Sequence, residues 1–244
     1  MTARFRSFAA GLGLALAAAA LLTACASPGS PGSSPSGSTE PPAEETEVSG
    51  AWLDGGRIIG LVTLGSSTCV PNAGDVAYTD GVLEVELVEP DGATACTADL
   101  APRVTLVTLP EGVDPTQELE IRVTGDGFQA DTDLDGVAGL EPSAETDYLP
   151  SAGWAGDDGQ LVVLSWGSSG CPPVVESAEV SSATEVTVTF ATPPADQVCT
   201  MDIAPRGTVV QVSDDSGLEA DAEVFAILTG GEFDNVRVPI LGTD

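Results

Sequence analysis

The sequence contains no histidine and no lysine, and its seven basic residues are all arginine. Without histidine the chain lacks the usual general base of serine hydrolases and the usual ligand of catalytic zinc sites. Seven arginines against 38 acidic residues give a formal net charge of −31. Binding to nucleic-acid phosphates or to anionic lipid headgroups requires clusters of basic side chains, which this acidic chain lacks. Electrostatic binding to nucleic acids or to anionic membranes is therefore not expected.

Aromatic residues are also scarce, at 5% of the chain, although hydrophobic residues make up 42%. Any core must therefore consist mainly of Val, Leu, Ile and Ala. Abundant Ala, Val, Gly and Pro, with arginine in place of lysine, fits a high-GC genome. The acidic surface is expected mainly to keep an exported protein soluble, and attraction to metal cations or to a basic partner stays open.

The N-terminus has the layout of a secretory signal peptide. Arg4 and Arg6 precede an apolar stretch from Ala9 to Leu22, which is short for a membrane-spanning helix. The stretch ends in Leu22-Thr23-Ala24-Cys25, which resembles the lipobox of bacterial lipoproteins. The resemblance implies that residues 1–24 are removed, that Cys25 is lipidated, and that the protein is anchored on the extracytoplasmic face of the cell membrane. Ordinary cleavage with a free Cys25 is the alternative.

Residues 25–50 are rich in Ser, Pro, Gly and Glu and offer little apolar surface to bury. They are expected to form a disordered tether. About two dozen such residues span roughly 25–30 Å on average. The tether would hold a folded domain clear of the lipid headgroups.

The rest of the chain is a tandem duplication. The segment Gly65–Pro71 recurs as Gly167–Pro173, and Cys96–Arg103 recurs as Cys199–Arg206. The division is into a first β-module over 51–125, an acidic linker over 126–152 and a second β-module over 153–244. The repeated pattern looks like modules of uncharacterised exported proteins from high-GC Gram-positive bacteria, a resemblance that implies no particular activity.

Both repeats show the patterns of β-strands, and no segment after the signal peptide has a convincing helical period. Short apolar or alternating runs are separated by turns rich in Gly, Pro and Asp. The expected fold is all-β, with two small antiparallel sandwiches or barrel-like modules in tandem. The predicted strands are Ile58–Leu64, Val76–Thr79, Val82–Val88, Arg103–Leu109, Glu118–Thr124, Leu161–Trp166, Val174–Val180, Glu185–Phe190, Arg206–Val212 and Glu223–Thr229.

Four cysteines besides Cys25 allow three disulfide pairings, and export would place them in an oxidising compartment. The duplication favours one local bridge in each repeat, Cys69–Cys96 and Cys171–Cys199. Each bridge would stabilise the fold by roughly 3–4 kcal/mol in the chain-entropy model. Metal ligation is the rival interpretation, but the Cys-x-x-Cys spacing is missing.

Asp99 and Arg103 recur as Asp202 and Arg206, in a chain with few arginines. In one interpretation, Arg103 and Arg206 clamp the carboxylate or phosphate of a ligand. In the favoured interpretation, each Asp caps a turn after the disulfide and each Arg pairs with it. The neighbouring Gly-Ser-Ser segments lack the Gly-x-Ser-x-Gly pattern of a nucleophile elbow, so a turn is expected there rather than a catalytic serine.

The predicted linker contains a motif typical of calcium loops. Asp131, Asp133 and Asp135 alternate before Gly136, as at the start of an EF-hand loop. The bidentate Glu is absent from the twelfth position, which is Pro142, and no flanking helices are predicted. The alternatives are a helix-free calcium loop and a flexible acidic loop; no other cofactor is expected.

Three tryptophans could form a platform for sugar stacking. Trp52 and Trp154 begin the two repeats at equivalent positions, however, and Trp166 takes the place of Leu64. Such positions favour packing in a core.

The sequence therefore predicts a lipid-anchored cell-envelope protein that is a non-catalytic binding or interaction protein. Its partner would be an envelope protein or a small ligand, besides the membrane itself. Two alternatives stay open: a structural, calcium-stabilised envelope component, and a hydrolase that uses carboxylates alone.

Overall fold

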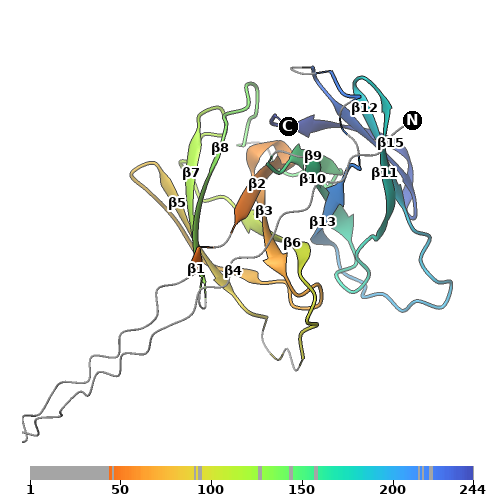
Figure 1. Cartoon of the computed structure of the whole chain (residues 1–244), viewed down its shortest axis with the longest axis horizontal. Coiled ribbons are helices and arrows are strands. Elements are labelled where there is room, and N and C mark those ends of the chain that lie inside the picture. Colours follow the sequence, from red (N-terminus) through yellow and green to blue (C-terminus); the bar gives the residue numbers. More distant parts are fainter. Residues whose placement is uncertain are drawn as a thin grey trace, which may run out of the picture. The chain divides into compact units, whose positions relative to one another are not determined.

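The computed structural model describes residues 44–45, 47–90, 92, 95–125, 128–142, 145–156, 159–213, 215, 217–219 and 222–243 (Figure 1). The expected signal peptide, Cys25 and most of the expected tether lie outside these residues. In the described residues the chain is all-β, as predicted, and a 3-10 turn at Asp54–Gly56 (η1) accompanies the strands. The strands are β1 (Glu44–Glu45), β2 (Val48–Leu53), β3 (Ile58–Gly65), β4 (Asn72–Thr79), β5 (Val82–Val88), β6 (Ala101–Thr108), β7 (Leu119–Gly125), β8 (Phe128–Leu134), β9 (Ser151–Trp154), β10 (Gln160–Gly167), β11 (Val175–Ser182), β12 (Glu185–Phe190), β13 (Ala204–Gln211), β14 (Phe225–Gly230) and β15 (Phe233–Leu241).

The ten strands predicted from the sequence are all present, with ends that differ by a few residues. They are the strands whose apolar residues form either an alternating pattern or a continuous run. The strands β1, β2, β8, β9 and β15 were not predicted. Since β2 begins at Val48, ordered structure starts within the range 25–50 expected to be a tether.

The strands form three sheets with the orders β1-β8-β7-β5-β4, β2-β3-β6 and β11-β12-β14-β15-β9-β10-β13. The parallel pairs in them are β1–β8, β5–β7, β12–β14 and β9–β15. Parallel pairing arises because the chain leaves β5 for β6 in another sheet before it returns to β7, which is a crossover rather than a hairpin. The expectation of two separate antiparallel sandwiches or barrels is therefore wrong: two of the three sheets contain parallel pairs, and the second repeat forms one continuous sheet.

Strand β8 lies within the range 126–152 that was expected to be a linker. It pairs antiparallel with β7 along its whole length. Its residue Leu134 is buried in the core of the first repeat, while Asp131 and Asp133 on the same strand are exposed. The alternation of the strand therefore explains the regular spacing of the aspartates, for which the sequence analysis left a calcium loop and a flexible acidic loop as alternatives.

Each repeat has its own apolar core. The first contains Trp52, Ile59 and Leu61 packed against the inner faces of β5, β7 and β8. The second contains Trp154 and Leu161 in the equivalent places. The tryptophans at the start of each repeat are core residues, as their equivalent positions indicated.

A third core joins the two repeats. It contains Ala51, Leu53, Ile58 and Val62 from the first repeat and Ala155, Val162 and Leu164 from the second. Strands β3 and β10 are buried on both faces, because one face of each lines its own core and the other lines the shared core. Burial on both faces accounts for the continuous apolar runs Ile58–Leu64 and Leu161–Trp166.

Close contacts fix how the strands cross at the shared core. A Cβ atom on Gly60 would lie 3.2 Å from Val162, and one on Gly207 would lie 2.8 Å from Val104. Val104 pairs with Val62, and Gly207 pairs with Leu164. At these contacts the rows of residues meet in the same order. At the β2–β9 edge the order is reversed, because Asp54, which follows β2, donates its N–H to Ser151 Oγ at 2.9 Å. The strands β3 and β10 therefore cross at an angle. Figure 1 shows the loops that follow both strands on the lower side of the view.

Candidate interaction surface

The structure contains the two predicted disulfides. Cys69 is bonded to Cys96 and Cys171 to Cys199, with a Cα–Cα distance of 5.5 Å in both. Each bridge ties the turn after β3 or β10 to the long loop before β6 or β13. Both bridged loops emerge at one end of the domain, on the lower side of Figure 1.

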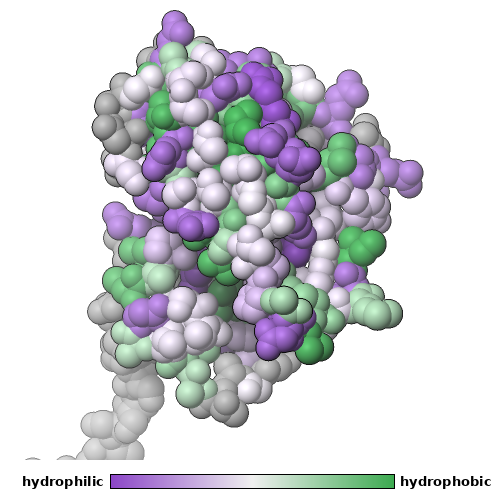
Figure 2. Space-filling view, turned by 90° about the vertical axis from the view of Figure 1, so that its right-hand side faces the viewer, coloured by the Kyte–Doolittle hydropathy of each residue, from purple (hydrophilic) through white to green (hydrophobic). Residues whose placement is uncertain are grey.

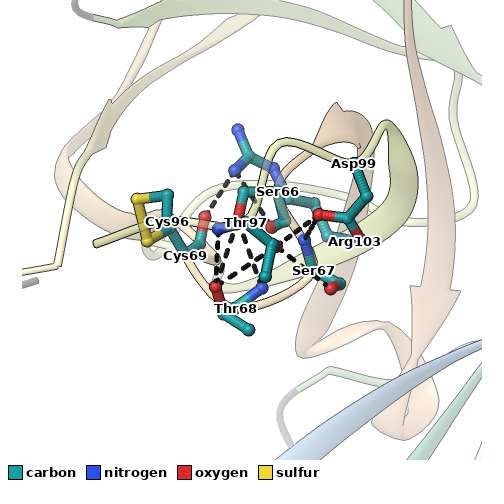
Figure 3. The surroundings of a disulfide bond; sticks show 8 residues. All are labelled: Ser66, Ser67, Thr68, Cys69, Cys96, Thr97, Asp99 and Arg103. Atoms are coloured by element: carbon teal, nitrogen blue, oxygen red, sulfur yellow. Dashed lines mark hydrogen bonds between the residues drawn. A yellow bond between two sulfur atoms is a disulfide. The ribbon is translucent and has the colours of Figure 1, made fainter.

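A compact polar network surrounds the first disulfide (Figure 3). The backbone N–H of Ser67 donates to Asp99 Oδ1 at 3.2 Å, and the Thr97 hydroxyl donates to the same oxygen. The hydroxyls of Ser66 and Thr97 lie 2.8 Å apart in a further hydrogen bond. Hydrogen bonds from Ser67, then from Thr97, lower the pKa of Asp99 from 3.8 to about 2, so this exposed carboxylate stays ionised at neutral pH.

The second repeat contains the same network. Ser169 N donates to Asp202 Oδ1 at 3.1 Å, Thr200 donates to the same oxygen, and the hydroxyls of Ser168 and Thr200 are 2.7 Å apart. Hydrogen bonds from Ser169, then from Thr200, lower the pKa of Asp202 to about 2. The serines of the Gly-Ser-Ser segments thus belong to a hydrogen-bonded turn, in a chain that has no histidine to activate one of them.

Arg103 supports this turn from the other side. Its guanidinium donates to the carbonyl oxygens of Cys69 and, at 3.5 Å, Ser66. It lies directly over Gly65, where a Cβ atom would be only 2.5 Å from the guanidinium carbon. Glycine at this position therefore lets the arginine reach the carbonyls. The expected pairing with Asp99 is replaced by separate contacts of both side chains with one turn.

Arg206 is buried more deeply than Arg103. It donates to the carbonyl oxygens of Cys171 at 3.0 Å and Trp166 at 3.2 Å, and it forms an ion pair with Glu232. Its side chain is only 5% exposed. Such a guanidinium stabilises the turn internally and has little surface left to clamp a ligand, so the ligand-binding role predicted for Arg103 and Arg206 gains no support from their surroundings.

The three aspartates of the calcium-like motif lie along β8 and just after it. Asp131 lies 3.4 Å from Arg122 of the adjacent strand, to which it pairs. Side chains two residues apart on a strand are separated by about 7 Å, so Asp131 and Asp133 do not converge as ligands do in a calcium loop. Among the residues described in the structure, no group of three or more carboxylate or cysteine side chains is placed to hold a metal ion.

Trp52 and Trp154 are 1% and 5% exposed, which leaves no ring face for a sugar. The Trp52 indole donates to the carbonyl oxygen of Asp135 at 2.8 Å. A cavity of about 170 Å³ lies beside both tryptophans and is also lined by Asp133 and Asp135. Pockets for organic ligands usually measure about 300–1,000 Å³, so this one is small for a substrate.

The strongest surface feature is one that the sequence analysis missed. Large apolar side chains that are exposed in the described part of the chain all lie at the end of the domain that carries the disulfides. We call this surface the apolar end. Its residues are Leu64, Val70, Val88, Leu100, Tyr148, Leu149, Val174, Val198, Met201 and Ile203.

The strand pairing places these residues at one end. Val88 is the last residue of β5 and pairs with Asn72, the first residue of β4, and Val174 directly precedes β11. Tyr148 packs edge-on against Trp166 at the end of β10, with 5.0 Å between ring centroids. Leu149 lies two residues before Ser151, which pairs with Leu164 near the same end. In Figure 2, hydrophobic residues are visible in both the upper and the lower part of the view, while hydrophilic residues are most abundant in the upper part.

The most exposed members come from the bridged loops. Met201 and Val198 are 104% and 91% exposed, and Leu100 and Ile203 are 75% and 73% exposed. Leu100 and Ile203 occupy equivalent positions in the two repeats, directly after the network aspartates. That equivalence was available from the sequence, since a large apolar residue follows the aspartate in both copies.

No family model, no curated protein and no solved structure matches this chain. None of the described segments is a helix long and apolar enough to cross a membrane.

Proposed function

We propose that the protein is an exported, non-catalytic interaction protein that acts at the outer face of the cell membrane, where a lipid on Cys25 holds it. The two disulfides support a location outside the cytoplasm, since such bonds persist in oxidising compartments. The lipobox-like string that ends in Cys25 supports the anchor. Both features agree with the secretory layout of the N-terminus.

The apolar end carries the proposal. Monomeric soluble proteins rarely expose contiguous apolar surface, and where they do, the surface often binds a partner. Here ten large apolar side chains share one end of a domain, in a chain whose formal net charge is −31. Such a surface fits contact with another molecule better than it fits solvent.

The loops that bear this surface are held rigidly. A disulfide, a buried or half-buried arginine and a hydroxyl–carboxylate network stabilise each of them. A rigid loop loses little conformational entropy on binding, so more of the contact energy is available for affinity. The stabilised turns therefore present the apolar side chains, a role that needs no catalytic group.

Site-specific photo-cross-linking in the native envelope tests the proposal. A photoreactive amino acid at Met201 is expected to give discrete cross-linked products in intact cells. The matched control is Ala183, which is exposed in the turn between β11 and β12 at the opposite end. Equal cross-linking at both positions, or none at either, would contradict a role for the apolar end.

The anchor is tested separately. The variant Cys25→Ser is expected to leave the membrane fraction when the cells are washed repeatedly with a large volume of low-salt buffer, because it lacks the acyl chains. Retention of this variant at the wild-type level would refute anchoring through Cys25.

A further inference from the structure

We propose that the apolar end docks directly on a lipid bilayer, with Leu100, Val198, Met201 and Ile203 entering the boundary between headgroups and acyl chains. The inference rests on the proposed location outside the cytoplasm. It also uses the proposed anchor at Cys25 to place the membrane, but it can be tested on a chain without the lipid.

The position at which the chain enters the fold favours a membrane as the occupant. Val48, the first residue of β2, pairs with Thr63 near the C-terminal end of β3. The preceding strand β1 pairs with Phe128 and Gln129 beside the turn between β7 and β8, at the same end. The chain that connects Cys25 to the fold therefore enters at the apolar end, and the 18 residues between Cys25 and Glu44 would span roughly 20–25 Å. A membrane that holds the N-terminus would lie opposite this surface.

The shape of the surface also fits a fluid partner. The four most exposed side chains project singly from the bridged loops, each with about three quarters or more of its area free. The cavity described above lies elsewhere, beside β2, β8 and β9. A protein partner would need a pocket of matching shape for each projecting side chain. A bilayer accommodates separate apolar side chains without a fixed shape.

The charges near these loops determine which lipids are suitable. Asp99 and Asp202 flank the apolar side chains, and Glu89 and Asp196 are exposed nearby in sequence. Carboxylates at headgroup level are repelled by anionic lipids, and salt screens that repulsion. Docking should therefore be strongest on uncharged headgroups and should strengthen with salt on anionic ones, which is opposite to the behaviour of a polybasic protein.

Vesicle co-sedimentation of the exported Cys25→Ser chain tests the inference. Phosphatidylcholine vesicles are expected to bind it with a partition coefficient on the order of 10³ M⁻¹, below that of a single myristoyl chain. The substitutions Leu100→Ser, Met201→Ser and Ile203→Ser should each lower the partition coefficient about tenfold, because each removes an apolar side chain that would be buried in the bilayer. The control Val82→Ser, at the half-buried start of β5 at the opposite end, should change it less than about twofold.

Several outcomes would overturn the inference. One is the absence of binding to phosphatidylcholine; others are equal binding by the serine variants, or tighter binding when about one third of the lipid is phosphatidylglycerol. If vesicles fail to bind while Met201 cross-links to a protein in cells, the apolar end faces a protein partner. That result would refute lipid docking and leave the proposed interaction function intact.

Discussion

The contact between β2 and β9 gives a sharp test of how the two repeats are joined. Gly153 of β9 lies against the backbone of Trp52, where a Cβ atom would be 2.2 Å from the carbonyl oxygen and 3.1 Å from the amide nitrogen. Both atoms belong to the backbone of a residue that is only 1% exposed, so neither can move aside easily. The substitution Gly153→Ala should therefore force the strands apart. Overpacking of this kind costs about 2–3 kcal/mol, which lowers the Tm by about 4–12 °C in a domain of this size.

The matched control is Gly170→Ala. A Cβ atom there would be 3.4 Å from its nearest neighbours, an ordinary contact, and the first repeat has Thr68 at the equivalent position. Thermal unfolding followed by circular dichroism, with both disulfides intact, should show a large loss for Gly153→Ala and almost none for the control. A Tm for Gly153→Ala within about 1 °C of wild type would refute the close crossing of β2 and β9.

Three further predictions concern the bridged loops. The pKa values of Asp99 and Asp202 are about 2 in the folded protein and near 3.8 when unperturbed, so their stabilising effect is present above pH 4 and is lost as the pH falls towards 2. The Tm of wild type and of the variant with Asn at both positions should therefore differ at pH 7 and converge near pH 2. A Tm difference that stays constant with pH would contradict the network. Replacing Cys171 and Cys199 by serine should lower the free energy of unfolding, measured with denaturant, by about 3–4 kcal/mol, because the bridge closes a loop with a sequence separation of 28. A loss under about 1 kcal/mol would contradict a stabilising role of this bridge. Arg206→Ala should cost about 1–2 kcal/mol in the same assay, because it leaves two partly buried carbonyl oxygens and the half-exposed Glu232 carboxylate without their donor. A neutral result would show that the guanidinium does not stabilise the turn.

The sequence predicted the strands and the disulfides well because local patterns specify them. Alternation in Val82–Val88 and Glu185–Phe190 matches β5 and β12 residue for residue. The duplication selected the correct cysteine pairing, since a bridge repeated in both copies must be local to each. These features depend on neighbours in sequence or on the repeat itself.

The arrangement of the strands depends on contacts between distant residues, and the sequence analysis did not capture it. Parallel pairing of β5 with β7 requires knowledge that β6 joins a different sheet. The aspartates of β8 imitated a calcium loop because period-two spacing is common to that loop and to a half-exposed strand. Burial of β3 on both faces was visible as the continuous apolar run Ile58–Leu64, which in a small domain implies a covering layer on each side.

The polar network was only partly anticipated. A capping role for Asp99 was expected and agrees with its hydrogen bonds to Ser67 and Thr97. The contact of Arg103 with carbonyl oxygens over Gly65 was not expected, because the register of β3 against β6 determines which groups the arginine reaches. The apolar end was missed because its residues are scattered over the sequence and gather only where the strands end.

Hydroxyl-radical footprinting of Met201 tests the central claim most directly and needs no substitution. Met201 is fully exposed, and it is the only methionine after the expected signal peptide. Thioether oxidation depends on access of the oxidant to the sulfur. If the apolar end is the surface through which the protein acts, Met201 should oxidise readily in the purified chain and be strongly protected in native membranes. Equal oxidation in both states would contradict the account.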